Sequence, residues 1–301
     1  MNSPSIRCVT VAGAGVLGAQ IAFQAAVHGF DVRLYDIDEA AIEAGRQRLA
    51  TLKMAYDTEA IASAAQTAAA LDSIQLTTVL SDALEDADLL IEAIPERLDI
   101  KQAFYTKVQG LAPPKTIFAS NSSTLTPSQL VSFTGRPGRF LHLHFAAPVR
   151  HHNIAEIMGH PDTAPAVFDA VVAFSKKIGM VAVPIDKEQP GYVLNTLLIP
   201  FLLSALSLVS KGIATYQIID KTWMICTDAK AGPFGAIDEI GITTAYNITR
   251  NLAEENPTSD GARIADYLKG NFIDTGRMGV GSGAGFYTYP NPEYLRSDFL
   301  K

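Results

Sequence analysis

Over roughly its first two-thirds, the chain alternates short apolar runs with longer segments whose apolar residues recur at helical spacing. The short runs, rich in β-branched residues, predict strands at residues 6–12, 31–35, 75–79, 88–94, 116–119, 140–145, 155–158 and 180–184. The longer segments predict helices at residues 19–28, 38–56, 60–70, 98–111 and 164–177. Strands that alternate with helices in this way predict an α/β fold.

The pattern changes after Pro190-Gly191, a pair that interrupts helices and strands alike. Beyond it only helical spacing remains, and it predicts helices at residues 192–208, 217–226, 241–254 and 261–269. A chain of 301 residues is also too long for one ordinary core. We therefore expect one domain over residues 1–188 and an all-helical C-terminal domain over residues 189–301.

Composition and charge narrow the class of protein. Hydrophobic residues make up 48% of the chain and charged residues 18%, which is typical of a globular protein. The net charge of −7, without a basic patch, argues against nucleic acid or a membrane surface as a partner. The apolar run over residues 192–209 contains Asn195 and Pro200, so we expect a buried helix there and not a membrane span.

Two further features bear on the cellular setting. Cys8 and Cys226 lie far apart and match neither a disulfide framework nor a metal-binding spacing. The N-terminal stretch lacks the charged and apolar regions of a signal peptide. We therefore expect a cytoplasmic protein without a bound metal.

A glycine-rich turn follows the first predicted strand directly, and a helix follows the turn. Its six residues would surround a dinucleotide: Gly13, Ala14, Gly15, Val16, Leu17 and Gly18. In this G-x-G-x-x-G pattern the first glycine allows a tight turn, and the second lets backbone N–H groups approach a pyrophosphate. The third glycine lets the helix pack against the strand. The first domain is therefore predicted to be a Rossmann-type dinucleotide-binding domain.

An acidic residue at the end of the second predicted strand indicates which dinucleotide is bound. Asp36 can accept hydrogen bonds from the hydroxyls of the adenosine ribose, with Ile37 beside it. No arginine follows Asp36, and a 2′-phosphate would meet repulsion from the acidic residues there. The sequence therefore favours NAD over NADP as the cofactor.

A candidate acid–base pair lies in residues 139–158. Glu156 interrupts an apolar strand, where a buried carboxylate needs a partner, and His142 and His144 lie on the preceding strand. A carboxylate that orients a histidine makes it a usable general acid or base near neutral pH. The stretch alone is equally compatible with an exposed Glu156 beside core histidines. Strand alternation cannot choose between His142 and His144, because both point to the same face.

Several motifs in order resemble the L-3-hydroxyacyl-CoA dehydrogenase family over nearly the whole chain. They are GAGVLG with Asp36, IEAIPE with Lys101, SNSST, RFLHLHF with Pro148 and IAEIM, QPGYVLN, GPFGAIDEIGITTA and GSGAGFY. The resemblance implies that His144 is the catalytic histidine and Glu156 its orienting carboxylate. It further implies that Ser123 and Asn195 contact the substrate, and that the C-terminal domain forms a homodimer.

The same resemblance implies that Glu96 and Lys101 hold the nicotinamide ribose region. Ligands of open α/β sheets sit beyond the carboxyl ends of the strands, so we expect Ala93, Ile94 and Asn121 to line the cofactor as well. For the polar row over residues 120–124, taken alone, a helix cap is the simpler interpretation.

Departures from the family concern the substrate. Ala147 stands where the family usually has asparagine, and the loop over residues 150–153 also differs. Residues 41–70 contain few bases, whereas relatives that bind coenzyme A often have a lysine-rich hairpin there. These features resemble the diketoreductase branch, whose members reduce free 3-oxo esters and acids.

We therefore expect an NAD(H)-dependent oxidoreductase that interconverts small 3-oxo and 3-hydroxy compounds. One alternative is a 3-hydroxybutyryl-CoA or 3-hydroxyacyl-CoA dehydrogenase of fatty-acid metabolism. An alternative of another class is a non-catalytic, NAD-bound structural protein of the crystallin kind.

Overall fold

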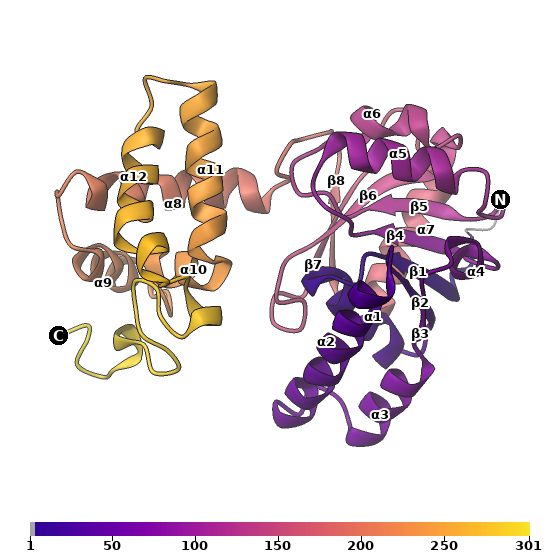
Figure 1. Cartoon of the computed structure of the whole chain (residues 1–301), viewed down its shortest axis with the longest axis horizontal. Coiled ribbons are helices and arrows are strands. Elements are labelled where there is room, and N and C mark those ends of the chain that lie inside the picture. Colours follow the sequence, from indigo (N-terminus) through magenta and orange to yellow (C-terminus); the bar gives the residue numbers. More distant parts are fainter. Residues whose placement is uncertain (1–3) are drawn as a thin grey trace. The chain divides into compact units, whose positions relative to one another are not determined.

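The computed structural model of the chain describes residues 4–301 and separates into two compact units, with the division between Val193 and Leu194 (Figure 1). The first unit is an α/β unit built on one sheet, and the second consists of helices and short connecting turns. This architecture confirms the predicted Rossmann-type fold with a helical C-terminal part.

The first unit is organised by an eight-stranded sheet of order β3-β2-β1-β4-β5-β6-β7-β8. The strands are β1 Cys8–Ala12, β2 Asp31–Tyr35, β3 Gln75–Thr77, β4 Leu89–Glu92, β5 Ile117–Ser120, β6 Phe140–Phe145, β7 Ile154–Met158 and β8 Val181–Ile185. The strands from β3 to β6 are parallel, β7 pairs antiparallel with β6, and β8 runs parallel to β7. All eight predicted strands are present, with ends that differ by at most two residues.

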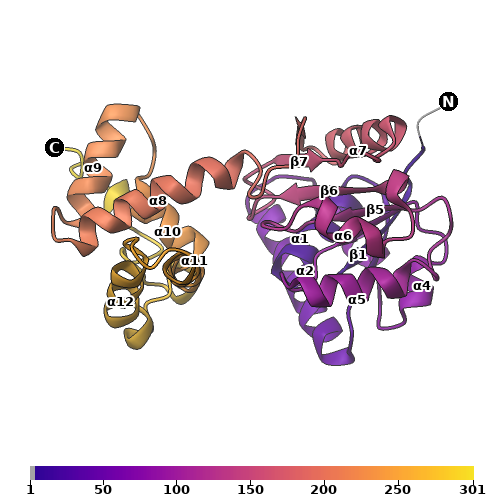
Figure 2. The ribbon, with the colours of Figure 1, turned by 90° about the horizontal axis from the view of Figure 1, so that it is seen from above.

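Helices cover both faces of this sheet (Figures 1 and 2). One face packs against α1 Val16–Val27, α2 Glu39–Thr58, α3 Ala64–Ser73 and α7 Pro165–Lys177. The other face packs against α4 Leu80–Leu84, α5 Leu98–Val108 and α6 Pro127–Leu130. Because both faces are covered, the central strands are buried throughout, which explains their nearly continuous apolar sequences.

Several helix starts in this unit differ from the prediction, and α1 and α2 show local reasons for the difference. The helix α1 begins at Val16 and not at residue 19, because the last part of the glycine motif is already helical and Gly15 is its N-cap. Asp38 lies before α2 and caps it, accepting a hydrogen bond from the N–H of Ala41 at 2.8 Å. Residues 120–124 do not cap a helix; α6 begins later and is capped by Thr126.

The second unit packs its helices around a core of its own. They are α8 Leu194–Ser210, α9 Tyr216–Thr227, α10 Pro233–Ile240, α11 Ile242–Glu255 and α12 Gly261–Asn271. The prediction missed α10 and placed the start of α8 two residues too early. Among residues 4–301, no helix has the length and apolar character needed to cross a membrane.

Buried carboxylates fasten the C-terminal segment to this helical unit. Asp238 of α10 accepts hydrogen bonds from the N–H groups of Phe286 and Tyr287 at 2.7 and 2.8 Å, and Asp220 of α9 accepts one from the Tyr287 hydroxyl at 2.9 Å. Burial raises the pKa of Asp238 and raises that of Asp220 to about 6. The GPFGAIDEIG and GSGAGFY motifs are thus two halves of one packed contact.

Candidate active site

The glycine-rich loop is shaped by close approaches that exclude side chains. Gly13 has a positive φ of 108°, and a Cβ atom there would lie 2.4 Å from the carbonyl oxygen of Ala93. A Cβ atom on Gly18 would lie 1.9 Å from the carbonyl oxygen of Gly13. Both glycines are therefore required by backbone packing between β1, α1 and the end of β4.

The middle of the loop, in contrast, is open. Apart from Gly15 and its two chain neighbours, no atom of the described residues lies within 4 Å of the position that a Cβ atom on Gly15 would take, and α1 begins there without a side-chain cap. The carboxylate of Asp36 accepts hydrogen bonds from the N–H groups of Ala14 and Ile37, both at 2.7 Å. An open helix N-terminus beside an ordered carboxylate fits the pyrophosphate and ribose of a dinucleotide.

The side chains of Val16 and Ile37 flank this opening, and both are largely exposed. Leu17 is half-buried against the core of the first unit. The end of β4 lies beside the loop, since β1 and β4 are neighbours at the point where the strand order reverses. Ala93 and Ile94 follow β4 there, which is where open α/β sheets bind their ligands.

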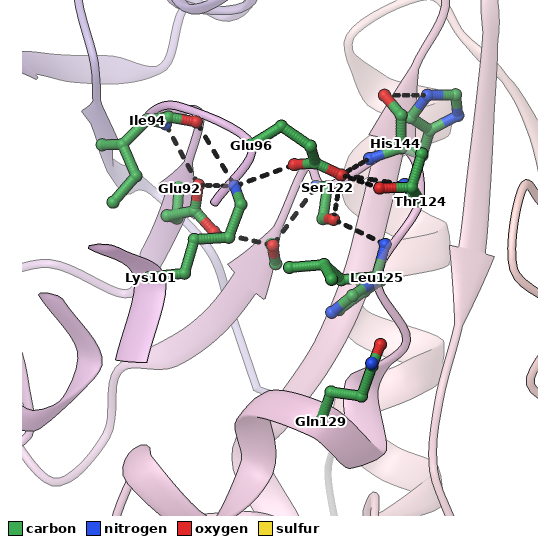
Figure 3. Close-up of polar contacts among 12 residues, drawn as sticks. Glu92, Ile94, Glu96, Lys101, Ser122, Thr124, Leu125, Gln129 and His144 are labelled. Carbon is green, nitrogen blue, oxygen red and sulfur yellow. Dashed lines mark hydrogen bonds and ion pairs between the residues drawn. The ribbon is translucent and has the colours of Figure 1, made fainter. Parts of the chain in front are cut away.

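Glu96 organises the loop that follows β5 (Figure 3). Its Oε1 atom accepts hydrogen bonds from the Ser122 hydroxyl at 2.5 Å, from the Ser123 N–H at 2.9 Å, and from the N–H and hydroxyl of Thr124, both at 2.8 Å. Burial opposes ionisation, but the hydrogen bond from Ser122 and the charge of Lys101 outweigh it and lower the pKa of Glu96 to about 2. The carboxylate is therefore ionised at neutral pH.

Lys101 lies beneath Glu96 and is almost fully buried (Figure 3). Its Nζ atom is 2.5 Å from Oε1 of Glu92, 3.3 Å from Oε2 of Glu96 and 3.3 Å from the carbonyl oxygen of Ile94. Glu92, itself fully buried in β4, also accepts a hydrogen bond from the Ser120 hydroxyl at 2.7 Å. Lys101 thus links the end of β4 to Glu96, and Glu96 in turn holds the loop after β5.

His144 lies between two partners. Its Nδ1 atom is 2.9 Å from Oε2 of Glu156, and its Nε2 atom is 3.2 Å from the Ser123 hydroxyl oxygen. His144 and Glu156 face each other directly across the antiparallel pair of β6 and β7, and both are buried. The second carboxylate oxygen of Glu156 accepts a hydrogen bond from the Val193 N–H at 3.0 Å. This arrangement corresponds to the pair interpretation of the sequence, with a buried Glu156.

His142 lies on the same face of β6 but in a different environment. It is fully buried, and burial, together with the charge of Lys101, lowers its pKa to about 3. Its Nδ1 atom is 3.0 Å from the hydroxyl oxygen of Tyr192, which itself donates to the carbonyl oxygen of Ser122 at 2.8 Å. A neutral, enclosed imidazole is poorly suited to exchange protons with a substrate.

The sequence reasoning did not single out two residues of this site. Glu92 carried the signal used for Glu156, a lone carboxylate in an apolar run, and could have been found by it. The helical pattern predicts that Tyr192 is the first residue of a helix, but it precedes α8 and has a positive φ of 55°. Its ring stacks on the imidazole of His144, with the ring centroids 4.6 Å apart and the planes at 15°.

The two asparagines of the prediction lie in different places. Asn121 is buried at the end of β5, and its Oδ1 atom accepts a hydrogen bond from the N–H of Phe145 at 2.9 Å. That bond ties the loop after β5 to the end of β6. Asn195 belongs to the helical unit, as the second residue of α8, and is half-buried there.

Comparison with known proteins identifies relatives over almost the whole chain. Residues 8–189 match the NAD-binding domain of 3-hydroxyacyl-CoA dehydrogenase, and residues 191–289 match its C-terminal domain. A probable 3-hydroxyacyl-CoA dehydrogenase of Caenorhabditis elegans is 32% identical, covering 94% of this chain and 93% of the relative. A probable 3-hydroxybutyryl-CoA dehydrogenase of Bacillus subtilis is 33% identical, covering 94% of this chain and 98% of the relative.

The solved structures include a closer relative. The solved structure of a diketoreductase, described as a dual catalyst of dicarbonyl compounds, is 49% identical in sequence, with a TM-score of 0.89. The match covers 95% of this chain and 99% of that chain. The resemblance stated from the motifs is thereby confirmed, including the similarity to diketoreductase.

The buried contacts of Lys101 predict a stability effect. Replacing Lys101 by Met leaves the Glu92 carboxylate buried without its cation, so we expect the free energy of unfolding to fall by about 3–5 kcal/mol. Urea denaturation would measure this change, and Lys107→Met, at an exposed position of the same helix, is the matched control. The double variant Glu92→Gln/Lys101→Met should recover part of the loss. A Lys101→Met protein of normal stability, weakened only in NADH binding, would show that Lys101 contacts the cofactor instead.

Proposed function

The chain belongs to the 3-hydroxyacyl-CoA dehydrogenase family, and on that premise we propose that His144 is its general acid and base. The protein is an NAD(H)-dependent oxidoreductase that interconverts 3-oxo and 3-hydroxy compounds. One observation carries the assignment of His144: its Nε2 atom faces the Ser123 hydroxyl, while Nδ1 is held by Glu156.

The proposed chemistry follows from these contacts. The Glu156 carboxylate accepts the Nδ1–H of His144, which fixes the tautomer and leaves the Nε2 lone pair directed toward Ser123. In oxidation, Nε2 takes the proton of the substrate hydroxyl, and Glu156 stabilises the imidazolium that forms. In reduction, the same imidazolium returns the proton to the developing alkoxide. Ser123 and Asn195 are proposed to hydrogen-bond the reacting oxygen or the neighbouring carbonyl.

The cofactor NAD, when bound, supplies the acceptor or donor of the hydride. We propose that the chain holds its pyrophosphate at the open N-terminus of α1 and its adenosine ribose at Asp36. Glu96 is ionised and partly exposed above Lys101, which suits an acceptor for ribose hydroxyls at the nicotinamide end. The matched family and relatives are dehydrogenases, which favours catalysis over a crystallin-like structural role.

Separate substitutions of His144 and Glu156 test this mechanism. His144→Ala should lower kcat by about 10²–10⁴-fold, the usual effect of removing a positioned proton-transfer group. Glu156→Gln should also lower kcat while NADH still binds, which a fluorescence titration would measure. His28→Ala, at the exposed C-cap of α1, is the control histidine. Turnover by His144→Ala at the wild-type rate would rule out the assignment.

For the substrate, we propose small free 3-oxo esters or acids in preference to coenzyme A thioesters. The bases of residues 41–70 already have partners within the unit. Arg46 pairs with Glu43 at 3.4 Å, Lys53 pairs with Asp57 at 2.6 Å, and Arg48 donates to the carbonyl oxygen of Ala14 at 3.1 Å.

The basic side chains of the loop after β6 have partners as well. Nε of Arg150 lies 3.1 Å from both carboxylate oxygens of Glu59, and Nε2 of His151 lies 3.3 Å from one of them. A polyphosphate would have to displace these carboxylates, and each charge-assisted hydrogen bond is worth about 1.5–3 kcal/mol. The structure described as a diketoreductase, 49% identical, supports the same proposal.

The substrate proposal predicts a specificity ratio. The value of kcat/KM for acetoacetyl-CoA should exceed that for a small 3-oxo ester by less than about a thousandfold, because remote coenzyme A contacts add little binding energy. A larger preference would favour the alternative, a 3-hydroxyacyl-CoA dehydrogenase of fatty-acid metabolism. Glu59→Gln should release Arg150 and improve kcat/KM for the thioester by about tenfold. Asp72→Asn removes the same charge from an exposed position of α3 and should leave the ratio unchanged.

We also propose a homodimer formed through the helical unit. Leu208 of α8 and Ile218 and Trp223 of α9 are 41%, 56% and 40% exposed, and they line a groove of about 420 Å³ between these helices. An apolar patch of this kind is typical of an interaction surface. A second copy of the chain is the occupant that the matched family's C-terminal domain favours.

Light scattering tests the dimer. Ile218→Glu should convert a particle of twice the chain mass into a monomer, because a charge would be buried at the contact. Leu295→Glu, at a position 66% exposed in the same unit, should leave the mass unchanged. A wild-type protein that is monomeric at micromolar concentration would refute the proposal.

The expected location is the cytoplasm. The structure describes Cys8 and Cys226 as free thiols, and unpaired thiols suit a reducing compartment. Fractionation of the source cells would check this, and recovery from an organelle or from outside the cell would contradict it.

A further inference from the structure

Tyr192 contacts three parts of the site at once. Its ring covers one face of the His144 imidazole, and its hydroxyl reaches both the Ser122 carbonyl and His142. The side chain is completely buried in the first unit. Building on the proposed role of His144, we propose that Tyr192 is a positioning residue that holds His144 and Ser123 in their reactive arrangement.

The ring contact fixes the plane of the imidazole. The Nδ1 hydrogen bond to Glu156 holds His144 at one atom, and rotation about that bond would still move Nε2 away from Ser123. A parallel aromatic ring with its centroid 4.6 Å away restricts this rotation. The electron-rich face of a phenol also stabilises the imidazolium more than the neutral imidazole.

The hydroxyl contact fixes the peptide that carries Ser123. The Tyr192 hydroxyl donates to the carbonyl oxygen of Ser122 at 2.8 Å, on one side of the Ser122–Ser123 peptide. On the other side of that peptide, the Ser123 N–H donates to Glu96 at 2.9 Å. The peptide is therefore held at both ends, which sets the position of the Ser123 hydroxyl.

His142 also belongs to this arrangement. It takes no part in the proposed proton transfer, but it contacts the Tyr192 hydroxyl. Because the Tyr192 hydroxyl proton is directed at Ser122, the oxygen accepts from Nδ1–H of His142, 3.0 Å away. His142 is therefore neutral with its proton on Nδ1, and its Nε2 atom has no hydrogen-bond partner among residues 4–301. A fully buried, neutral histidine acts here as a donor that orients the tyrosine hydroxyl.

The backbone around Tyr192 is shaped for these contacts. Gly191 and Tyr192 both have positive φ, 79° and 55°, and the left-handed conformation is uncommon for a tyrosine. The next residue, Val193, donates its N–H to the second oxygen of Glu156 at 3.0 Å. One turn thus presents a ring to His144 and an N–H group to the carboxylate that His144 depends on.

Two substitutions separate the contributions of ring and hydroxyl. Tyr192→Phe keeps the stacked ring and removes the hydrogen bonds, so we expect kcat to fall about tenfold with an unchanged KM for NADH. Tyr192→Leu removes the ring as well and should lower kcat further. Tyr56→Phe is the matched control, since it removes another buried hydroxyl of the same unit, one bonded to Gln24.

The pH profile of reduction distinguishes positioning from simple loss of stability. The groups that face His144 are the carboxylate of Glu156, the neutral His142 on the same strand, Ser123 and Tyr192. Without the ring, the imidazolium is less stable, so the pH above which kcat/KM declines should fall by about one unit in Tyr192→Leu. In Tyr192→Phe that pH should stay unchanged. A merely unfolded fraction would lower the rate at every pH without moving the midpoint.

The outcomes separate this inference from the proposed mechanism. Wild-type kcat in Tyr192→Phe together with a wild-type pH midpoint in Tyr192→Leu would overturn the role of Tyr192. If Tyr192→Leu does not fold, Tyr192→Phe alone decides, and wild-type kcat in it overturns the inference. If His144→Ala is inactive and the Tyr192 variants are normal, the acid–base mechanism holds and only the role of Tyr192 is refuted. If His144→Ala is active, the acid–base mechanism itself is refuted.

Discussion

The burial of Glu156 is the constraint on which the proposed catalytic part of the first unit depends. A carboxylate in the middle of an apolar strand, 1% exposed, is expensive unless both of its oxygens find donors. The antiparallel register of β6 and β7 places His144 directly opposite, and the turn before α8 brings the N–H of Val193 to the other oxygen. A shift of one residue in that register would turn Glu156 to the opposite face of the sheet. The position of the proposed acid–base pair is therefore a consequence of the strand pairing.

A buried charge that needs partners also organises the part of the first unit that is proposed to hold the cofactor. There the central group is a cation. Lys101 neutralises Glu92 within β4 and supports Glu96 above it, and Glu96 gathers the loop after β5. That loop presents Ser123 to His144. Polar loops are ordinarily mobile, but this one is anchored to Glu96, which pairs with the buried Lys101, so these contacts set the position of Ser123.

The sequence could predict those parts of the fold and of the candidate site whose residues lie close together along the chain. The glycine motif and Asp36 are adjacent parts of one βαβ unit, and spacing alone located them. His142 and His144 could not be told apart by alternation, because the difference lies in what each meets across the sheet: Met158 for one and Glu156 for the other. Such pairings depend on register, which the sequence of β6 does not contain.

Tyr192 was missed for a related reason. An apolar residue at the start of a helical pattern is ordinarily interpreted as the first core contact of the helix, and only the preceding Pro190-Gly191 indicated a turn. The contacts of the ring and the hydroxyl come from β6 and from the loop after β5, distant in sequence.

The pairing of the basic residues also indicates which segment would determine substrate selectivity. Exposed ion pairs such as Arg46 with Glu43 contribute little and exchange partners readily, so an incoming phosphate could compete for them. Arg150 is different, because its side chain is only 22% exposed and its Nε lies between both oxygens of Glu59. Drawing Arg150 away would leave a partly buried carboxylate without its main cation. If the proposed preference for free 3-oxo compounds holds, the loop after β6, more than the base-poor hairpin, is therefore the element that we expect to oppose a polyphosphate.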